Sequence, residues 1–272
     1  MSLLLPDTLS LYIAPDRVQA VKATGWSRRA VEVRQREATV QAADNWQGLA
    51  RVVTELARQS KARRLHIVLS DKLARYASFP WGAELRNAAE DLSMARMNFD
   101  EVYGANTSTD WHFGFSAARP GQSRISVAVP QSLFALLQSN FGDPQLEVAS
   151  IQTAFCATLQ THRKQLGDKG WMINLEEGRL TLGCWSDHSW NWIYSVHAEL
   201  NSPEALLHRV RQEIQLSSTS LKAEQPVSIF LHAPAFEHLP FGKLEGVRFI
   251  PLKTEDKKAG AKYAFALMGV NP

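Results

Sequence analysis

Three adjacent residues, Asp187, His188 and Ser189, have the side-chain types of a hydrolytic triad, in which a carboxylate orients a histidine that activates a serine. They fall where the sequence predicts a tight hairpin turn. Neighbours in such a turn cannot reach the base-to-nucleophile geometry that this chemistry needs. The chain also contains neither G-x-x-x-x-G-K-[ST] nor G-x-S-x-G. We therefore interpret the three residues as a polar turn.

Histidine and cysteine spacing does not indicate a metal site. His232 and His238 flank Pro234 at a spacing that matches no common zinc pattern, and we expect both to be loop histidines. Cys156 and Cys184 are too few for a disulfide framework and lack C-x-x-C spacing. We expect both cysteines to be reduced core residues.

The composition is that of a soluble globular protein. The 272 residues are 45% hydrophobic and 21% charged, with a formal net charge of +3, which excludes disordered, collagenous and coiled-coil chains. That charge is too small to indicate nucleic acid as a partner. Pro6 and Asp7 interrupt the apolar start, and no run reaches the ~18 apolar residues that cross a bilayer. We expect a cytoplasmic location.

The apolar pattern predicts one order of elements twice. The first half has strands over 9–14, 17–23 and 30–40, a helix capped by Asp44, and a strand over 65–69. It closes with a strand over 125–129, a helix over 131–139, and a strand and helix over 146–160. The second half has strands over 171–175, 179–185 and 189–197 and a helix opened by Ser202 and Pro203. Strands over 227–231 and 247–251 and a helix over 259–270 complete it.

In outline each half is therefore β-β-β-α-β-α-β-α, which predicts an α/β protein with two lobes of mixed sheet and flanking helices. We place the first lobe at residues 1–165 and the second at 166–272. The chain between the strands over 65–69 and 125–129 is longer than a crossover needs. It predicts an inserted subdomain at about 71–123, with a helix over 84–97 and a strand over 111–115.

Short motifs accompany this doubled order: LYIAPDRV at 11–18, VLSD at 68–71, RY at 75–76, FPW at 79–81 and GAKYAFAL at 260–267, besides the helical stretch 85–99 and the strand 171–175. Together they resemble the actin-like ATPases, whose fold is a duplicated ribonuclease H-like unit. Within that superfamily the chain is similar to the PilM and GspL group, cytoplasmic components of type IV pilus and type II secretion inner-membrane platforms.

The resemblance implies where ATP would be held. Each lobe opens with a hairpin whose glycine lets backbone N–H groups approach the phosphates, and acidic residues hold Mg²⁺ through water. In PilM-like ATP binders the first hairpin reads roughly Asp-x-Gly-Ser-x-x-x-Lys. The matching positions here are Tyr12, Ala14, Pro15 and Gln19, so the acid, glycine, serine and lysine are all absent. Pro15 has no backbone N–H to offer.

The second hairpin should read Asp-x-Gly with a threonine beyond the turn. This chain has Asn174 and Glu176 there, so an amide replaces the metal acid and a carboxylate occupies the phosphate position. Degeneracy in both hairpins predicts a pseudo-ATPase without ATP, Mg²⁺ or another cofactor. The alternative is an ATP-binding or ATP-hydrolysing protein with altered phosphate loops. A ribonuclease H-type nuclease is disfavoured because Tyr12 and Asn174 stand where its metal carboxylates would be.

The inserted subdomain carries the residues that we assign to partner binding. In PilM-like proteins the groove beside it receives the cytoplasmic tail of a single-pass membrane partner. Phe79, Trp81, Trp111 and Phe115 are the aromatic candidates for such a groove here. The alternative is that these side chains pack the subdomain itself.

Two other features have two interpretations each. A basic cluster ends the first helix of the first lobe, where its cations either complement the helix dipole or contact anionic lipid. In the second lobe, Trp190 and Trp192 are expected on one sheet face by their period-two spacing, close to Trp185. They form either core or partner surface. The basic cluster at the end of the first helix consists of Arg58, Lys61, Arg63 and Arg64.

These expectations combine into a non-catalytic cytoplasmic scaffold of a pilus or type II-like secretion platform. Its implied partner is the cytoplasmic tail of a PilN-like single-pass inner-membrane protein, which gives an indirect association with the bacterial inner membrane. A homodimer is left open, and no nucleic acid is expected as a partner.

Overall fold

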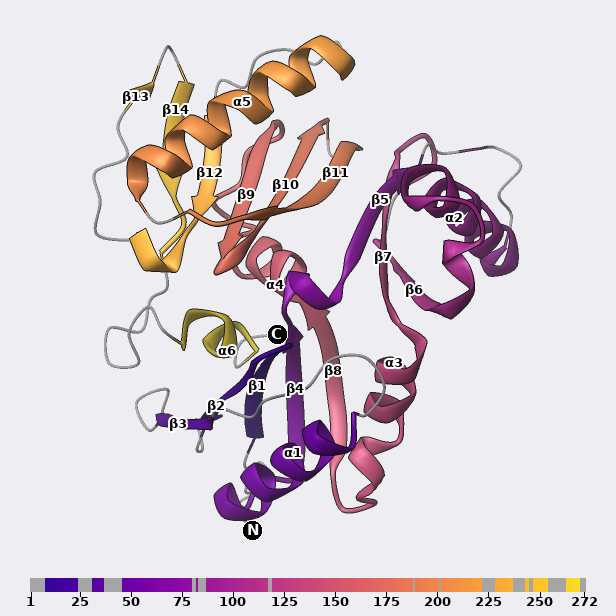
Figure 1. The fold of residues 1–272 in the computed structure, drawn as a ribbon, viewed down its shortest axis with the longest axis vertical. Helices are drawn as coiled ribbons and strands as arrows, with labels where there is room; N and C mark the ends of the chain where they lie inside the picture. The colour runs from indigo at the N-terminus through magenta and orange to yellow at the C-terminus, as the bar shows by residue number, and fades with distance from the viewer. Residues whose placement is uncertain are drawn as a thin grey trace.

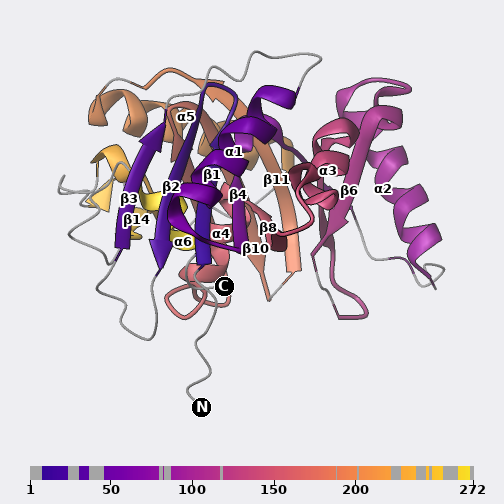
Figure 2. The same ribbon diagram turned by 90° about the horizontal axis from the view of Figure 1, so that it is seen from below.

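The computed structural model describes residues 8–23, 31–36, 46–79, 82, 87–116, 119–187, 189–200, 202–221, 228–236, 243–244, 247–253 and 263–269. These residues form two large sheets, one per lobe, and a small three-stranded sheet beside them (Figure 1). Viewed from below, the small sheet and its helices project to one side of the first-lobe sheet (Figure 2).

The first-lobe sheet has the order β3-β2-β1-β4-β8. A hairpin meander supplies its antiparallel part, and β4 and β8 run parallel to β1. Alternation along β1 sends Leu11 and Ile13 into the cluster that contains α1, and sends Tyr12 to the opposite face. The elements are β1 (Thr8–Ala14), β2 (Arg17–Ala23), β3 (Val31–Arg36), α1 (Gln47–Ser60), β4 (Arg64–Leu69) and β8 (Glu147–Thr153).

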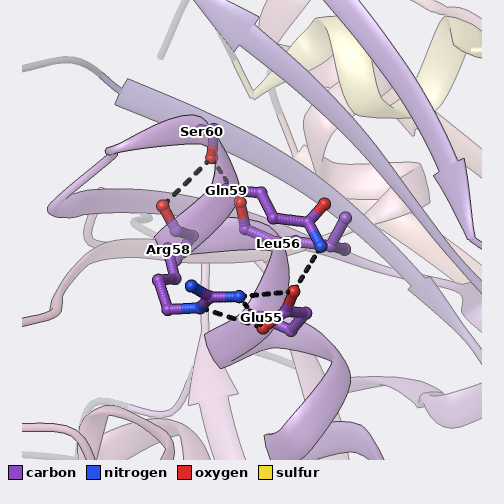
Figure 3. Close-up of polar contacts among 6 residues, drawn as sticks. Glu55, Leu56, Arg58, Gln59 and Ser60 are labelled. Carbon is purple, nitrogen blue, oxygen red and sulfur yellow. Dashed lines mark hydrogen bonds and ion pairs between the residues drawn. The ribbon is translucent and has the colours of Figure 1, made fainter.

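Residues of the basic cluster at the end of helix α1 form ion pairs within the chain. Figure 3 shows the last turn of this helix, where the Arg58 guanidinium donates to the Glu55 carboxylate at 2.9 and 3.0 Å. In the same turn, the Ser60 hydroxyl donates to the Leu56 carbonyl. Arg64 lies 3.7 Å from Glu147. Two of the four cations therefore belong to exposed intramolecular pairs, each contributing up to about 1 kcal/mol. The predicted cap, Asp44, lies outside the described residues, and Trp46 occupies the N-cap position instead.

The second-lobe sheet repeats the plan. Its order is β11-β10-β9-β12-β14-β13, so its first five strands reproduce the first-lobe order, and α5 covers one face (Figure 1). Ser202 accepts from the Ala205 N–H at 3.1 Å, as the predicted cap requires. The elements are β9 (Gly170–Glu176), β10 (Gly178–Ser186), β11 (Ser189–Ala198), α5 (Pro203–Leu221), β12 (Ser228–His232), β13 (Lys243–Leu244) and β14 (Val247–Pro251).

Two short helices, α4 (Ala154–Thr161) and α6 (Ala264–Met268), lie between the sheets (Figure 1). Although α6 follows the second lobe in the chain, it packs on β1 of the first lobe. The Ser10 hydroxyl donates to the Ala266 carbonyl, and the Tyr12 and Phe265 rings stack at 5.2 Å. The range 166–272 therefore includes a helix that completes the first lobe. The other residues of the helix predicted over 259–270 lie outside the described part, except Tyr263 and Gly269 beside α6.

The insertion is larger than predicted. Its sheet has the order β5-β7-β6, and α2 packs on it through Phe99 and Ala95. Strand β7, expected in the main sheet over 125–129, pairs with β5 and β6 instead, so the inserted sheet extends past residue 123. A period-two pattern indicates a strand but not its partners, which is why the prediction was wrong. The elements are β5 (Arg75–Phe79), α2 (Ala88–Tyr103), β6 (Trp111–Phe115), β7 (Arg124–Pro130) and α3 (Gln131–Gln138).

A β-bulge shows that the predicted placement of Trp190 and Trp192 on one sheet face was wrong. The register between β10 and β11 shifts so that Asn191 is the extra residue between Trp190 and Trp192. Trp192 therefore packs at right angles on Trp171, whereas Trp190 packs against Phe155 of α4. A Cβ on Gly183 would lie 2.7 Å from the Trp190 ring, so only glycine permits this approach. The two indoles lie on opposite faces, with Trp192 buried in the second-lobe core and Trp190 partly buried against the other cluster.

Candidate functional site between the lobes

The carboxyl ends of parallel strands from both sheets meet between the lobes, the place where α/β proteins form their ligand sites. β1 brings Tyr12 to this place, and the residues after β4 bring Ser70 and Asp71. From the second lobe, β9 brings Asn174 and Glu176. All five side chains are at most 3% exposed. We call them, with Thr158 and His232, the interlobe cluster.

Glu176 joins the lobes through both of its carboxyl oxygens. One accepts from the Tyr12 hydroxyl at 2.9 Å, and the other accepts from the Ser70 hydroxyl at 3.0 Å and from the Asp71 N–H at 2.8 Å. All three donors come from the first lobe. Burial, reinforced by the nearby Asp71 carboxylate, raises the pKa of Glu176 to about 8. The carboxyl group therefore carries its proton over much of the neutral range.

Asp71 is the second buried acid of the cluster. Its carboxylate accepts from the Tyr76 hydroxyl, from the Phe155 N–H at 3.0 Å and from the Asn174 amide at 3.0 Å. Burial raises the pKa of Asp71 despite these donors. The sequence analysis did not identify Asp71 as a site residue. The only signal was its place directly after a buried strand, within the VLSD motif.

Asn174 connects Asp71 to His232. Because its amide nitrogen donates to Asp71, its oxygen is the acceptor for the Thr158 hydroxyl at 3.1 Å and the His232 Nδ1 at 2.8 Å. His232 is fully buried at the end of β12, so the prediction of a loop histidine was wrong; His238 lies outside the described residues. Burial and the neighbouring His162 lower the pKa of His232 to about 3. The imidazole is therefore neutral at pH 7.

The two hairpin turns are also joined to each other. Arg17, after the first turn, lies 2.6 Å from the Glu177 carboxylate in the second turn. The Glu177 side chain is 73% exposed, so solvent screens this pair. Ala14 and Gln19 are buried, and Pro15 stands in the turn. The opening residues of both lobes thus contact each other directly.

No protein-family model and no curated protein sequence matches the chain. Solved structures do match it over nearly its full length. A PilM–PilN type IV pilus biogenesis complex gives a TM-score of 0.66 at 13% identity, covering 97% of this chain and 99% of that one. A Bacteroides thetaiotaomicron protein with an actin-like ATPase fold and unknown function gives 0.58 at 11%, covering 98% and 96%. The fold is the actin-like ATPase fold.

A third similar structure is the cytoplasmic domain of EpsL, an inner-membrane component of the type II secretion system of Vibrio cholerae. It gives a TM-score of 0.56 at 12% identity, covering 98% of this chain and 95% of that one. Identities this low show the fold alone. Among the described residues, no helix has the length and apolar character needed to cross a bilayer.

In the actin-like fold, this chain fills the space between its hairpins with its own side chains. The resemblance placed the acid of the first hairpin at the position of Tyr12 and phosphate at the position of Glu176, and these two side chains are hydrogen-bonded to each other. A phosphate there would displace Glu176 and face a second buried acid, Asp71. Gly178, with φ +73°, has the Lys72 ammonium 3.6 Å from where its Cβ would stand.

The remaining candidate chemistry is not assembled. The Asp187 carbonyl accepts from Gln122, and the Ser189 hydroxyl accepts from the Ser123 N–H, so both contact the insertion; His188 lies outside the described residues. In the described part of the chain, no three histidine, cysteine or acidic side chains are grouped as metal ligands. Cys156 and Cys184 are free, as predicted, and burial raises the pKa of each to about 11.

The predicted partner aromatics separate into core and surface. Phe79 is 1% exposed and belongs to the core of the insertion. Trp111 packs on Phe99 and lies 4.6 Å from the Arg75 guanidinium. Phe115 is 36% exposed and meets Phe79 edge to face, while Trp81 lies outside the described residues. Of the four, Phe115 is the one that the described structure leaves at the surface.

Proposed function

We propose that this protein is a non-catalytic cytoplasmic scaffold of a type IV pilus or type II-like secretion platform. In this role it docks the cytoplasmic segment of a single-pass inner-membrane partner and reaches the membrane through that partner. The proposal is supported by the full-length likeness to a PilM–PilN complex and to the cytoplasmic domain of EpsL. A PilN-like protein is the proposed partner, and nucleic acid has no role in the proposal.

The interlobe cluster carries the non-catalytic part of the proposal. Glu176 ties Tyr12, Ser70 and the Asp71 N–H together where the resemblance would place phosphate. Admitting ATP would require the buried Glu176 carboxyl to leave these three donors, and would place a negatively charged phosphate beside the buried Asp71. Pro15 and Asn174 add the loss of a backbone donor and of a metal ligand. Work through surface contacts fits this site better than phosphoryl transfer.

The alternative is an ATPase with altered loops. Lys72, beside Gly178, is the feature that favours it, since an ammonium group there could attract a phosphate. Such an enzyme would hydrolyse ATP with turnover that is lost in Asn174→Ala, because that variant removes the side chain at the metal-acid position.

The docking part is tested with peptides. The N-terminal cytoplasmic segments of short single-pass membrane proteins encoded beside this gene are synthesised and titrated calorimetrically into the full chain. The proposal predicts saturable binding of one such segment and no ATP turnover. Failure of every segment to bind, or turnover that Asn174→Ala abolishes, would overturn the proposal.

A further inference from the structure

The insertion and the second lobe meet along a seam between two edge strands. β5 is an edge strand of the inserted sheet, and β11 is an edge strand of the second-lobe sheet. The two strands lie side by side (Figure 1) but belong to different sheets. Where β11 begins, the seam is closed by a hydrogen bond of 3.0 Å from the Ser123 N–H to the Ser189 hydroxyl. The opposite end lies near Arg75, the first residue of β5.

Basic side chains of the second lobe and of the first lobe meet at that opposite end. Arg179 of β10 and His197 of β11 are directly opposite each other in the sheet, so they share one of its faces. Lys72 belongs to the short helix η1 (Asp71–Leu73), which directly precedes β5. Its ammonium and the His197 ring lie 3.6 and 3.8 Å from the point that a Cβ on Gly178 would occupy. Three basic side chains therefore lie around the start of β10.

The insertion adds Arg75 to this group. Its guanidinium carbon lies 5.1 Å from the centre of the Tyr103 ring and 4.6 Å from that of the Trp111 ring. Burial raises the pKa of Tyr103, and the charges of Arg75 and Arg179 both act in the opposite direction. The two guanidinium groups therefore lie near the same hydroxyl, one from the insertion and one from the second lobe. We call Lys72, Arg75, Arg179 and His197 the cationic seam.

The acids that stand closest along the strands have other partners. Glu176 is opposite Arg179 in the register of β9 and β10, but its carboxyl group accepts from first-lobe donors. Glu177 pairs with Arg17 at 2.6 Å. Glu199 lies 3.5 Å from His197, and both side chains of that pair are more than 70% exposed.

Three cations of the seam consequently have no acid beside them. Within the described ranges, no carboxylate lies within 4.0 Å of the charged nitrogens of Lys72, Arg75 or Arg179. The Arg179 Nε is buried and has no hydrogen-bond acceptor among the described atoms. Buried donors in folded proteins are nearly always paired, so this one indicates an acceptor that the chain does not supply itself.

The arrangement of the charges indicates which anion fits. Guanidinium and ammonium groups bind both carboxylates and phosphates. The cations here come from four elements and extend from β10 and β11 across to the insertion. Carboxylates that are spaced along a peptide match such a distribution better than the single charge centre of a phosphate ion does. The complementary ligand is therefore an acidic stretch of chain.

We propose that the cationic seam binds a short acidic segment of a partner protein. Asp or Glu carboxylates of the segment pair with Lys72, Arg75 and Arg179, so the segment contacts the insertion and the second lobe together. Cytoplasmic flanks of membrane-spanning helices are rich in Lys and Arg. The acidic segment therefore belongs to a second partner, separate from the membrane partner of the proposed function.

The test uses a defined acidic probe and a control that is matched in charge. A fluorescent peptide of alternating Glu and Ser residues, and its Gln/Ser counterpart, are titrated into the full chain at low salt and followed by anisotropy. Arg179→Gln and Arg75→Gln are compared with Arg63→Gln, because each variant removes one positive charge. Arg63 is exposed before β4, at the opposite end of that strand from Lys72. Urea denaturation checks that each variant folds, and Arg75→Gln keeps the test decisive if Arg179→Gln does not.

The Glu/Ser peptide should bind about 10-fold more weakly to Arg179→Gln and to Arg75→Gln, and within about 2-fold of wild type to Arg63→Gln. Arg179→Lys keeps the charge and should stay within about 3-fold of wild type. Added salt should weaken binding to wild type more than binding to Arg75→Gln. No saturable binding to wild type, equal binding of the Gln/Ser peptide, or equal losses in Arg63→Gln and the seam variants would each overturn the proposal.

Inorganic phosphate serves as a competitor. If phosphate displaces the probe with a lower Kd than the probe itself, and loses affinity in Arg179→Gln, the surface is a phosphate site and the acidic segment is ruled out. The proposed function is tested separately. A platform segment that binds while the Glu/Ser peptide does not would remove the cationic seam alone, and the reverse result would remove the platform role alone.

Discussion

The interlobe cluster and helix α2 of the insertion differ in how far their side chains are exposed to solvent. Between the lobes, Glu176 and Asp71 each accept three hydrogen bonds, all but one of the six donors coming from the first lobe. On α2, Met97 leaves most of its surface to solvent. Buried side chains of the two lobes are hydrogen-bonded to each other in the interlobe cluster, whereas α2 of the insertion exposes a large apolar side chain.

The largest effect should come from Glu176→Ala. The substitution leaves the Tyr12 and Ser70 hydroxyls and the Asp71 N–H without their acceptor, so we expect a loss of about 3 kcal/mol in the free energy of unfolding. Met97→Ala, in the exposed region, should change it by at most about 0.5 kcal/mol. Urea denaturation of both variants measures the contrast. Equal stabilities would remove the distinction between the two regions.

The insertion itself divides into core and surface. Phe79→Ala should lower the free energy of unfolding by about 3 kcal/mol, because its ring is buried among Ala95, Phe99 and Phe113. Phe115→Ala should cost about 1 kcal/mol or less, since this ring is 36% exposed. Chemical denaturation measures both variants, and a larger loss in free energy of unfolding for Phe115→Ala than for Phe79→Ala would contradict this division.

The raised pKa of Glu176 makes stability depend on pH. In the unfolded chain the carboxyl titrates near 4.5, and in the folded protein near 8. The folded protein therefore binds this proton more tightly than the unfolded chain does. The stabilising contribution of the protonated Glu176 carboxyl is complete below pH 4.5 and is lost as pH rises through about 8.

Glu176→Gln should remove that pH dependence, since an amide does not titrate. We expect wild type to lose a few kcal/mol relative to Glu176→Gln between pH 5 and 9, about 1.4 kcal/mol per pKa unit at most. Urea denaturation at a series of pH values measures both proteins. Parallel curves would mean that Glu176 ionises normally in the folded state.

The smallest effect concerns the exposed pair between the hairpin turns. A double-mutant cycle of Arg17→Ala and Glu177→Ala should give a coupling of about 0.2–1 kcal/mol that falls in high salt, because Glu177 is 73% exposed. A coupling free energy larger than the loss in free energy of unfolding of Glu176→Ala would show that the exposed pair, and not the buried cluster, is the stronger contact between the lobes.

Local pattern was sufficient to predict the duplicated strands and the opening hairpins. Alternation along β1 and β2, and the Ser202-Pro203 signal, are properties of neighbouring residues, so the sequence contains them. Tyr12 and Asn174 were identified through the resemblance. Their contacts were not, because Asp71 meets Glu176 across 105 positions of sequence. No local pattern encodes that distance.

The insertion shows the same limit. Phe79, Trp111 and Phe115 were correctly located in the subdomain, but Phe79 is buried and Phe115 is exposed. That difference depends on β5 pairing with β7, which a period-two pattern cannot specify. The bulge at Asn191 likewise separates Trp190 from Trp192, although their spacing predicted one face.

Calorimetric titration of Mg-ATP into the wild-type chain tests most directly whether the interlobe cluster replaces the nucleotide. With Glu176 and Asp71 buried where phosphate would enter, we predict no saturable heat up to about 1 mM nucleotide. Binding with a Kd of a few micromolar would contradict the account, because it would require the cluster to open and admit the phosphates.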